Sequence, residues 1–247
     1  MAYNIIKGSI SNALSSSGAD VGLTTSNTSN TASSTATLYA TVAGTSAGDA
    51  RVQYAVTGTT TWTQGIDNSD SDAYALAASS ALGTTNVMRV STAGEINYPL
   101  QPAFLAYLAT SDSNVTGDGT AFQLGSGNAL TEVFDQNGDF NTNGTFTAPV
   151  TGRYQLSTKW NVTGLTTAMT VGSLTTITSN RSGVFTLDPA KVFDNNTTMS
   201  YIFTALFDMD AADTAVTSLQ ISNGTKVASI QANATNLQTT FNGFLVC

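Results

Sequence analysis

Hydrophobic and polar residues alternate in short runs through most of the chain. Residues 51–56 and 154–162 alternate with a period of two, and residues 200–207 form a longer apolar run. A period of two is typical of half-buried strands, whereas an amphipathic helix repeats its apolar positions every three to four residues. Turns rich in Gly, Asn and Asp separate the runs. The pattern therefore predicts an all-β protein in which no segment forms a long helix.

The same pattern divides the chain into three parts. Residues 1–35 hold a short apolar patch and then a Ser/Thr/Asn/Ala tract without the bulky side chains that offset the entropy of ordering. We expect either a disordered tail or, preferably, a flexible leader that attaches the chain to a larger assembly through Ile5, Ile6 and Ile10. Residues 36–101 form a small β-rich neck. Pro99 and Pro102 favour an extended connector, and residues 102–247 form the head.

In the neck, residues 37–42, 51–56 and 86–91 are the expected strands, and Trp62 is expected in the core. The segment has few large apolar side chains, too few for an independent core of its size. Several copies that pack around a common axis would supply the missing burial. The sequence therefore predicts a trimeric neck.

In the head, residues 103–108 form the first expected strand and residues 111–119 a polar loop. A hairpin follows at 169–187, and the apolar run at 200–207 is expected at the centre of a sheet. With strands at 154–162, 218–222, 227–232 and 239–246, roughly eight to ten strands fit a two-sheet jelly roll.

One motif in the head is specific. Its residues are Phe146-Thr-Ala-Pro149-Val-Thr-Gly152-Arg-Tyr154, and the chain ends Phe241-Asn-Gly243-Phe-Leu-Val-Cys247. This combination resembles the signature of the complement-one-q-type globular head, which has a tumour-necrosis-factor-like jelly roll. The resemblance covers about residues 102–247. It implies a trimeric recognition head without catalytic activity. The residues expected in its core or at its trimer axis are Phe104, Tyr154, Phe203, Phe207 and Phe244.

The neck resembles a module of fibre proteins from tailed bacteriophages. The similar features are a Val56-x-Gly58-x-x-x-Trp62 strand, a loop of residues 65–72 and the run from Leu82 to Ile96. This likeness implies a fibre or decoration protein on the surface of a virion.

Composition excludes several classes of function. The 247 residues include no His, which removes the commonest general base and transition-metal ligand. A net charge of −8 with eight Lys and Arg gives no basic patch for nucleic acid. No apolar run approaches the ~18 residues of a membrane span. Cys247 is the single cysteine, so an intrachain disulfide is impossible, and the thiol is expected to be buried or, alternatively, to bridge two chains.

Three acidic loops are candidate calcium sites. The spacing of Asp135, Asn137 and Asp139 is closest to a calcium loop, but Phe140 stands where the helical type needs Gly. Residues 67–72 are expected to be a solvated turn, and residues 208–213 an exposed loop or an acidic rim at the apex of the head. We expect no other cofactor, and the scattered acids argue against a glycosidase.

The sequence therefore favours a homotrimeric bacteriophage fibre. Its leader would bind other virion proteins, and its head would contact a host receptor or glycan with the avidity of three copies. One alternative is a capsid decoration or head-fibre protein that mainly stabilises the virion. Another is a bacterial surface adhesin, which would require an export signal that we do not recognise at the N-terminus.

Overall fold

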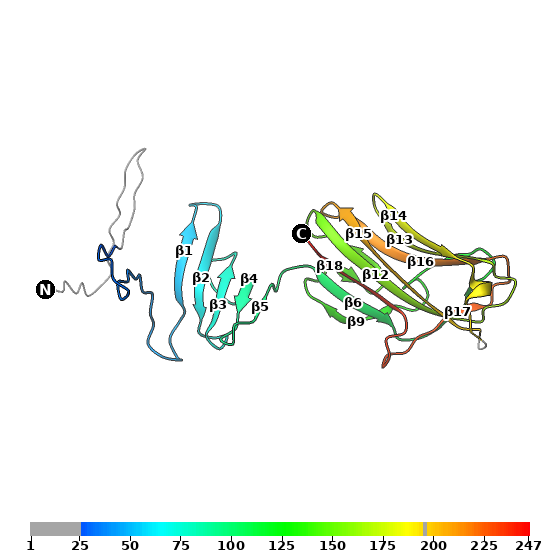
Figure 1. Cartoon of the computed structure of the whole chain (residues 1–247), viewed down its shortest axis with the longest axis horizontal. Helices are drawn as coiled ribbons and strands as arrows, with labels where there is room; N and C mark the ends of the chain where they lie inside the picture. Colours follow the sequence, from blue (N-terminus) through cyan, green and yellow to red (C-terminus); the bar gives the residue numbers. More distant parts are fainter. Residues whose placement is uncertain (1–25, 195–196) are drawn as a thin grey trace.

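The computed structural model describes residues 26–194 and 197–247, and Ile5, Ile6 and Ile10 lie outside this range. Strands account for its regular structure apart from one 3-10 turn, η1 (Pro189–Lys191). Figure 1 shows the neck as one sheet, followed by a head of two facing sheets. The all-β class and the two-sheet jelly roll are confirmed. In the described part of the chain, no helix is long and apolar enough to cross a membrane.

The neck is an antiparallel five-stranded meander in the order β1-β2-β3-β4-β5. Its strands are β1 (Ala50–Ala55), β2 (Thr61–Asp67), β3 (Ala73–Ala77), β4 (Asn86–Val90) and β5 (Ile96–Asn97). The strand expected at 37–42 is wrong, because these residues form no strand and lie exposed ahead of the sheet. Among residues 26–194 and 197–247 no strand pairs with them, and pairing is what stabilises a strand.

The described residues of the head, 102–194 and 197–247, form thirteen strands, more than expected. They are β6 (Ala103–Leu108), β7 (Asp112–Thr116), β8 (Ala121–Gln123), β9 (Leu130–Asp135), β10 (Phe140–Asn141), β11 (Thr145–Thr147), β12 (Gly152–Thr163), β13 (Val171–Thr178), β14 (Ser182–Leu187), β15 (Met199–Met209), β16 (Thr214–Ser222), β17 (Ala228–Ile230) and β18 (Thr240–Leu245). Several are only two or three residues long, which a periodic pattern does not reveal. The expected loop at 111–119 is partly wrong, because β7 lies within it.

In one head sheet the strand order is β9-β6-β18-β12-β15. In the same sheet, β17 pairs with the last two residues of β12, and β7 pairs with β17. The other contains β10, β11, β16, β13 and β14, with β8 beside β16. The expected hairpin is confirmed as β13 and β14. The central position expected for residues 200–207 is wrong. β15 pairs with β12 alone and forms an edge, and its apolar character comes from apolar side chains on both faces.

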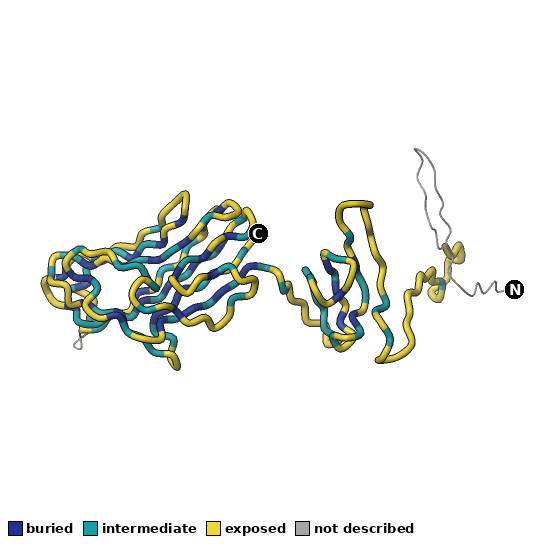
Figure 2. The backbone as a smooth tube through the Cα atoms, turned by 180° about the vertical axis from the view of Figure 1, so that it is seen from behind, coloured by how far each residue is buried: buried dark blue, intermediate teal, exposed yellow. Residues whose placement is uncertain are grey.

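The aromatic core of the head lies between the two sheets, where Figure 2 shows the buried backbone. The ring of Phe104 stacks on Phe140 and Phe146 with centroid distances of 4.6 and 4.8 Å, and it meets Phe241 edge-on at 5.1 Å. Trp160 is fully buried. Burial of large rings at these distances is the main apolar contribution to folding of the head.

Candidate interaction surfaces

The complement-one-q-like motif forms a closed corner at the end of the head that faces the neck. Phe146 and Ala148 are buried, and the hydroxyl of Tyr154 donates a 2.7 Å hydrogen bond to the carbonyl of Val150. A Cβ atom on Gly152 would lie 2.6 Å from the Leu245 side chain and 2.8 Å from the Cys247 carbonyl oxygen. The C-terminal residues therefore pack against the corner, so the motif has a structural role: it joins the start of β12 to the end of the C-terminal strand.

The candidate calcium loop is a hydrogen-bonded turn at this same end. The two carboxylate oxygens of Asp135 accept from the backbone N–H groups of Asp139 and Phe140, at 3.1 and 2.9 Å. The side-chain amide of Asn137 donates to Asp139 at 3.1 Å, and burial raises the pKa of the Asp139 carboxyl. No group of three or more His, Cys, Asp or Glu side chains in residues 26–194 and 197–247 could hold a metal ion. The hydrogen bonds account for the loop as a turn, and calcium at this position stays a prediction.

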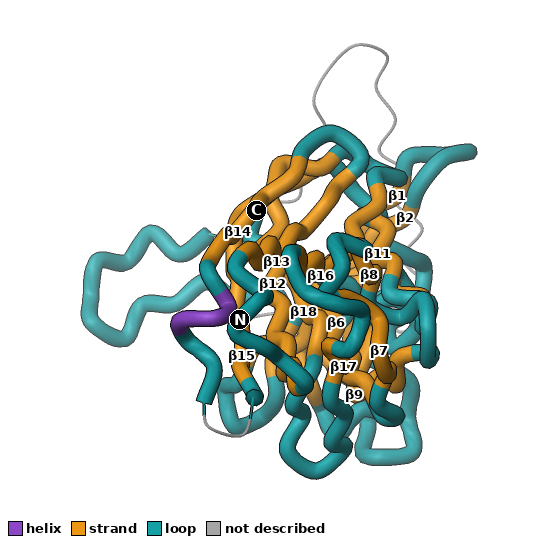
Figure 3. The backbone as a smooth tube through the Cα atoms, turned by 90° about the vertical axis from the view of Figure 1, so that its right-hand side faces the viewer, coloured by secondary structure: helices purple, strands orange, loops and turns teal. Residues whose placement is uncertain are grey.

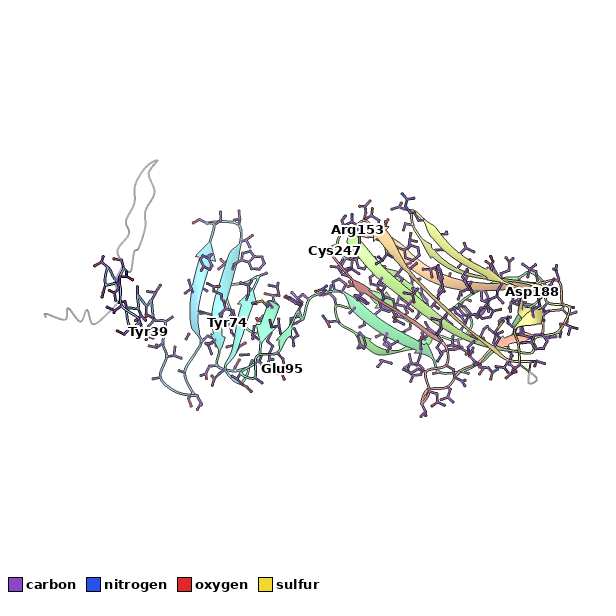
Figure 4. All side chains as sticks on the ribbon, viewed as in Figure 1. Tyr39, Tyr74, Glu95, Arg153, Asp188 and Cys247 are labelled. Atoms are coloured by element: carbon purple, nitrogen blue, oxygen red, sulfur yellow. The ribbon has the colours of Figure 1, made fainter. Side chains whose placement is uncertain are left out.

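The acidic residues at 208–213 also lie at the neck-facing end, where residues 210–212 form the expected exposed loop, and the alternative of a rim at the apex is wrong. Asp213 accepts from the backbone N–H of Asp210 at 2.9 Å and from the amide of Asn180 at 2.6 Å. The loop connects β15 to β16, and both strands meet the neck-facing edge there. Figure 4 shows Arg153 and Cys247 at this end of the head and Asp188 at the opposite end.

The residues expected in the core or at a trimer axis separate into two groups. Phe104, Tyr154 and Phe207 are buried, and Phe203 is partly buried against the same core. Phe244 is 43% exposed on the outer side of its sheet. A position for any of them at a trimer axis stays a prediction. Cys247, expected to be buried, is exposed because β18 ends two residues earlier.

The outer side of the sheet that contains β12 is open and poor in charge. Residues paired directly across antiparallel strands point to the same side, so the pairing defines the rows on this face. The three central rows are Leu206–Gln155–Phe244–Ala103, Thr204–Ser157–Asn242–Leu105–Phe134 and Ile202–Lys159–Thr240–Tyr107–Thr131, and at the neck-facing end of the same face Arg153 is paired with Asp208. Within the three central rows of the described chain, Lys159 is the one charged residue.

Apolar side chains gather at the two flanks of this outer face. We call the side chains at one flank, Leu105, Phe134 and Phe244, the face patch; a hollow of about 470 Å³ lies between them. We call Ile202 and Leu206 on β15, together with Phe185 on the neighbouring edge strand β14 of the other sheet, the edge patch. Phe185 and Ile202 also line a groove of about 480 Å³ beside η1. Each member of the edge patch is at least 40% exposed. Sequence periodicity does not reveal these patches. It shows that both sides of an edge strand are apolar, but not which side is left exposed to solvent.

The end of the head away from the neck consists of polar loops, and Figure 3 looks onto this end. Residues 164–170, 223–227 and 231–239 connect strands here. Hydrogen bonds connect neighbouring loops. The Asn223 amide donates to the Thr170 hydroxyl at 2.7 Å, and the Gly224 N–H donates to the Gly117 carbonyl at 2.9 Å. Thr and Asn are the commonest polar residues in these loops. Such a surface offers hydroxyl and amide hydrogen-bonding groups on a cross-linked frame, together with the charged residues Lys226 and Asp188.

Comparison with solved structures gives matches over the head-sized part of the chain. They include the globular domain of zebrafish complement 1qA, with 18% identity over 60% of this chain and 98% of that chain, at a TM-score of 0.39. Murine APRIL matches at 10% identity over 59% and 99% of the two chains, with a TM-score of 0.40. The PRD1 vertex protein P5 matches at 11% identity over 60% and 99%, with a TM-score of 0.42. No protein-family model and no curated protein sequence matches this chain. At these scores the likeness carries no inference about partners or activity.

Proposed function

We propose that this protein is a homotrimeric structural protein of a bacteriophage virion, which displays its head for contact with a host surface. The observation that carries the trimer is the position of the two patches: the face patch lies on the outer face of the sheet that contains β12, and the edge patch lies at the opposite edge of that sheet, where β15 lies beside Phe185 of the other sheet. A contact between two different patches is head-to-tail, and head-to-tail contacts form a closed ring when the rotation per copy divides a full turn. The low charge of the outer face removes the like-charge repulsion that copies with a net charge of −8 would otherwise meet.

The virion setting is supported by the neck residues that resemble phage fibre modules. The chain also has the order expected of a fibre: a leader, a neck and a head whose free end lies away from the neck (Figure 1). The polar loops of that free end suit a neutral, hydroxyl-rich ligand such as a surface glycan, which is bound by many hydrogen bonds. Three heads on one stalk would raise the effective affinity of weak single contacts.

The trimer is tested by light scattering on the full chain in the presence of chelator. We expect a mass of three chains. Phe244→Glu places a charge in the face patch and should shift the mass toward one chain. Val171→Glu is the matched control, because Val171 is 48% exposed on a strand of the other sheet. A monomeric wild-type chain, or equal effects of the two substitutions, would contradict the trimer.

The display role is tested separately. Antibodies against the head should label fibre tips in electron micrographs of particles that carry this chain, whereas uniform labelling of the capsid would favour the decoration alternative. The trimer should also be retained on immobilised lipopolysaccharide, capsular polysaccharide or teichoic acid from the host. Retention that survives replacement of residues 233–236 and 223–225 by Gly/Ser linkers would exclude the free-end loops as the contact surface.

A further inference from the structure

The neck sheet carries its large side chains on one face. Strand pairing aligns three rows on this face: Val52–Gln64–Leu76–Met88, Tyr54–Trp62 and Ile66–Tyr74–Val90–Ile96. We call these residues the neck face. Tyr54 is 55% exposed, Ile96 58% and Trp62 40%. Trp62, expected in a core, is therefore uncovered in the single chain, and Figure 2 shows β1 as exposed backbone.

The opposite face of the neck sheet is already covered by the chain itself. It presents the small side chains of Ala75 and Ala77, which are buried together with Leu82 from the following loop. The Thr63 hydroxyl donates to the Ser79 carbonyl of that loop at 2.7 Å. The side with the small residues thus has its second layer, and the side with the aromatic residues has none among residues 26–194 and 197–247. A sheet needs a second layer on its apolar side to be stable.

The neck face can be buried without leaving a charge or an unpaired Gln64 amide group away from water. It contains no charged residue, since Arg51, Asp67 and Arg89 lie on the opposite face. Its central polar residue, Gln64, is held at both ends: the amide nitrogen donates to the Tyr54 hydroxyl at 2.7 Å, and the amide oxygen accepts from the Tyr74 hydroxyl at 2.9 Å. Water can therefore leave this face without orphaning the Gln64 oxygen or nitrogen, which avoids the usual cost of burying an amide.

We propose that each neck face is covered by the neck faces of two further copies of this chain, so that three sheets form the sides of a triangular prism with the aromatic rows inside. The inference rests on the proposed homotrimer and names the surface that joins its necks. Identical copies fit because the face is uncharged, so three of them can converge although each chain carries a net charge of −8. A charged partner would find no complementary group on the face. The exposed apolar area also continues across all five strands, as expected of an interface rather than of scattered surface residues.

The test compares two single-cysteine variants of the full chain in a Cys247→Ser background. Val52→Cys lies on the neck face, and Ala55→Cys lies on the same strand but on the opposite face, and both positions are exposed in the single chain. Maleimide-polyethylene glycol labelling is followed by gel shift, and the mass is measured by light scattering on the same samples. We expect a trimer mass with Val52→Cys labelled at least ten-fold more slowly than Ala55→Cys. In denaturant the two rates should become equal.

The other outcomes separate the two proposals. A trimer in which both thiols react equally fast would overturn the neck prism and leave the trimer of heads standing. A monomer would overturn both, whatever the labelling. A trimer whose Val52→Cys protection disappears when residues 1–35 are deleted would identify the chain's own N-terminal segment as the cover, and it would also overturn the prism. Persistent protection in that deletion supports it.

Discussion

The head and the neck place their aromatic side chains in opposite ways. In the head, Phe104, Phe146 and Trp160 point between two sheets and are buried within one chain. In the neck, Tyr54, Trp62 and Tyr74 stand on the open side of a single sheet. The difference indicates that the head can fold alone and that the neck depends on neighbours. Stability measured in the two regions should therefore respond differently to substitution and to dilution.

The largest expected effect removes a ring from the head core. Phe104→Ala should lower the free energy of unfolding of the head by about 3–5 kcal/mol, because it leaves a cavity between three stacked or edge-on rings. Denaturant unfolding followed by Trp160 fluorescence measures it. The Trp62 signal of the neck should be affected much less. A loss below about 1 kcal/mol would mean that the ring cluster is not the core of the head.

A smaller effect is expected in the neck from Gly65→Ala. A Cβ atom there would lie 2.2 Å from the Ala50 carbonyl oxygen and 2.6 Å from the Arg51 Cα atom, so β1 must move away from β2. The cost should be about 1–3 kcal/mol, typical of overpacking. It should appear in the neck transition and in the trimer mass but not in the head transition. Gly48→Ala is the control, because nothing lies within 4 Å of its added Cβ atom.

The next effect concerns the corner at the neck-facing end of the head. Tyr154→Phe removes the hydrogen bond to the Val150 carbonyl and should cost about 1 kcal/mol, the usual net value for one such bond. Because the ring stays in place, the aromatic core should remain intact. Thermal unfolding of the head measures the change, and an unchanged midpoint would show that the bond contributes nothing to the corner.

The smallest expected effect is a pH dependence of the stability of the head, caused by a carboxyl group in the head. Burial raises the pKa of the Asp112 carboxyl, so the folded chain binds this proton more tightly than the unfolded chain. The group's contribution to stability is therefore largest below its unfolded pKa of about 3.9 and falls as pH rises through the raised folded value. Asp112→Asn should raise stability slightly at neutral pH, and this advantage should shrink as pH falls.

Asp118→Asn is the control with the opposite sign. Hydrogen bonds from Thr120 hold the pKa of Asp118 below its usual range, so its contribution is present at neutral pH and is lost as pH falls through the lowered value. Unfolding curves across the acidic range compare the two variants. The same sign for both would contradict the environment described for Asp112. Its carboxylate accepts from the Asn128 side chain at 2.7 Å, and its other buried oxygen has no hydrogen-bond partner among the residues that the structure describes.

The sequence predicts where the strands of this protein lie along the chain better than it predicts which strands pair with one another. Period-two alternation located residues 51–56 and 154–162 as strands, because each residue type reports the side it faces. It could not assign residues 200–207 to an edge or residues 37–42 to a coil, since both depend on which strands lie alongside. The neck face had a signal in the spacing of Val52, Tyr54, Trp62 and Gln64, but the rows appear only once the pairing of β1 with β2 is known.

The placement of charges and loops was also beyond the sequence. The acidic run at 208–213 could stand at either end of the head, and only the direction of β15 assigns it to the neck-facing end. Phe244 and Phe241 are three residues apart in one apolar strand, yet the first is exposed and the second is fully buried. Their odd spacing places them on opposite faces of the strand, but which face is covered depends on the facing sheet, which local patterns do not encode.

The most direct test of the contrast between the two regions uses the chain's two tryptophans, one in each region. Trp160→Phe leaves Trp62 as the reporter of the neck, and it removes a buried indole N–H that has no hydrogen-bond partner in the described part of the chain. The measurement is acrylamide quenching of Trp62 fluorescence in this full-length variant, at protein concentrations above and below dissociation of the assembly. We predict that Trp62 is shielded in the assembly and becomes accessible on dilution. A Trp62 that is equally accessible at every concentration, in a chain that still has the mass of a trimer, would contradict a neck held together by its aromatic face.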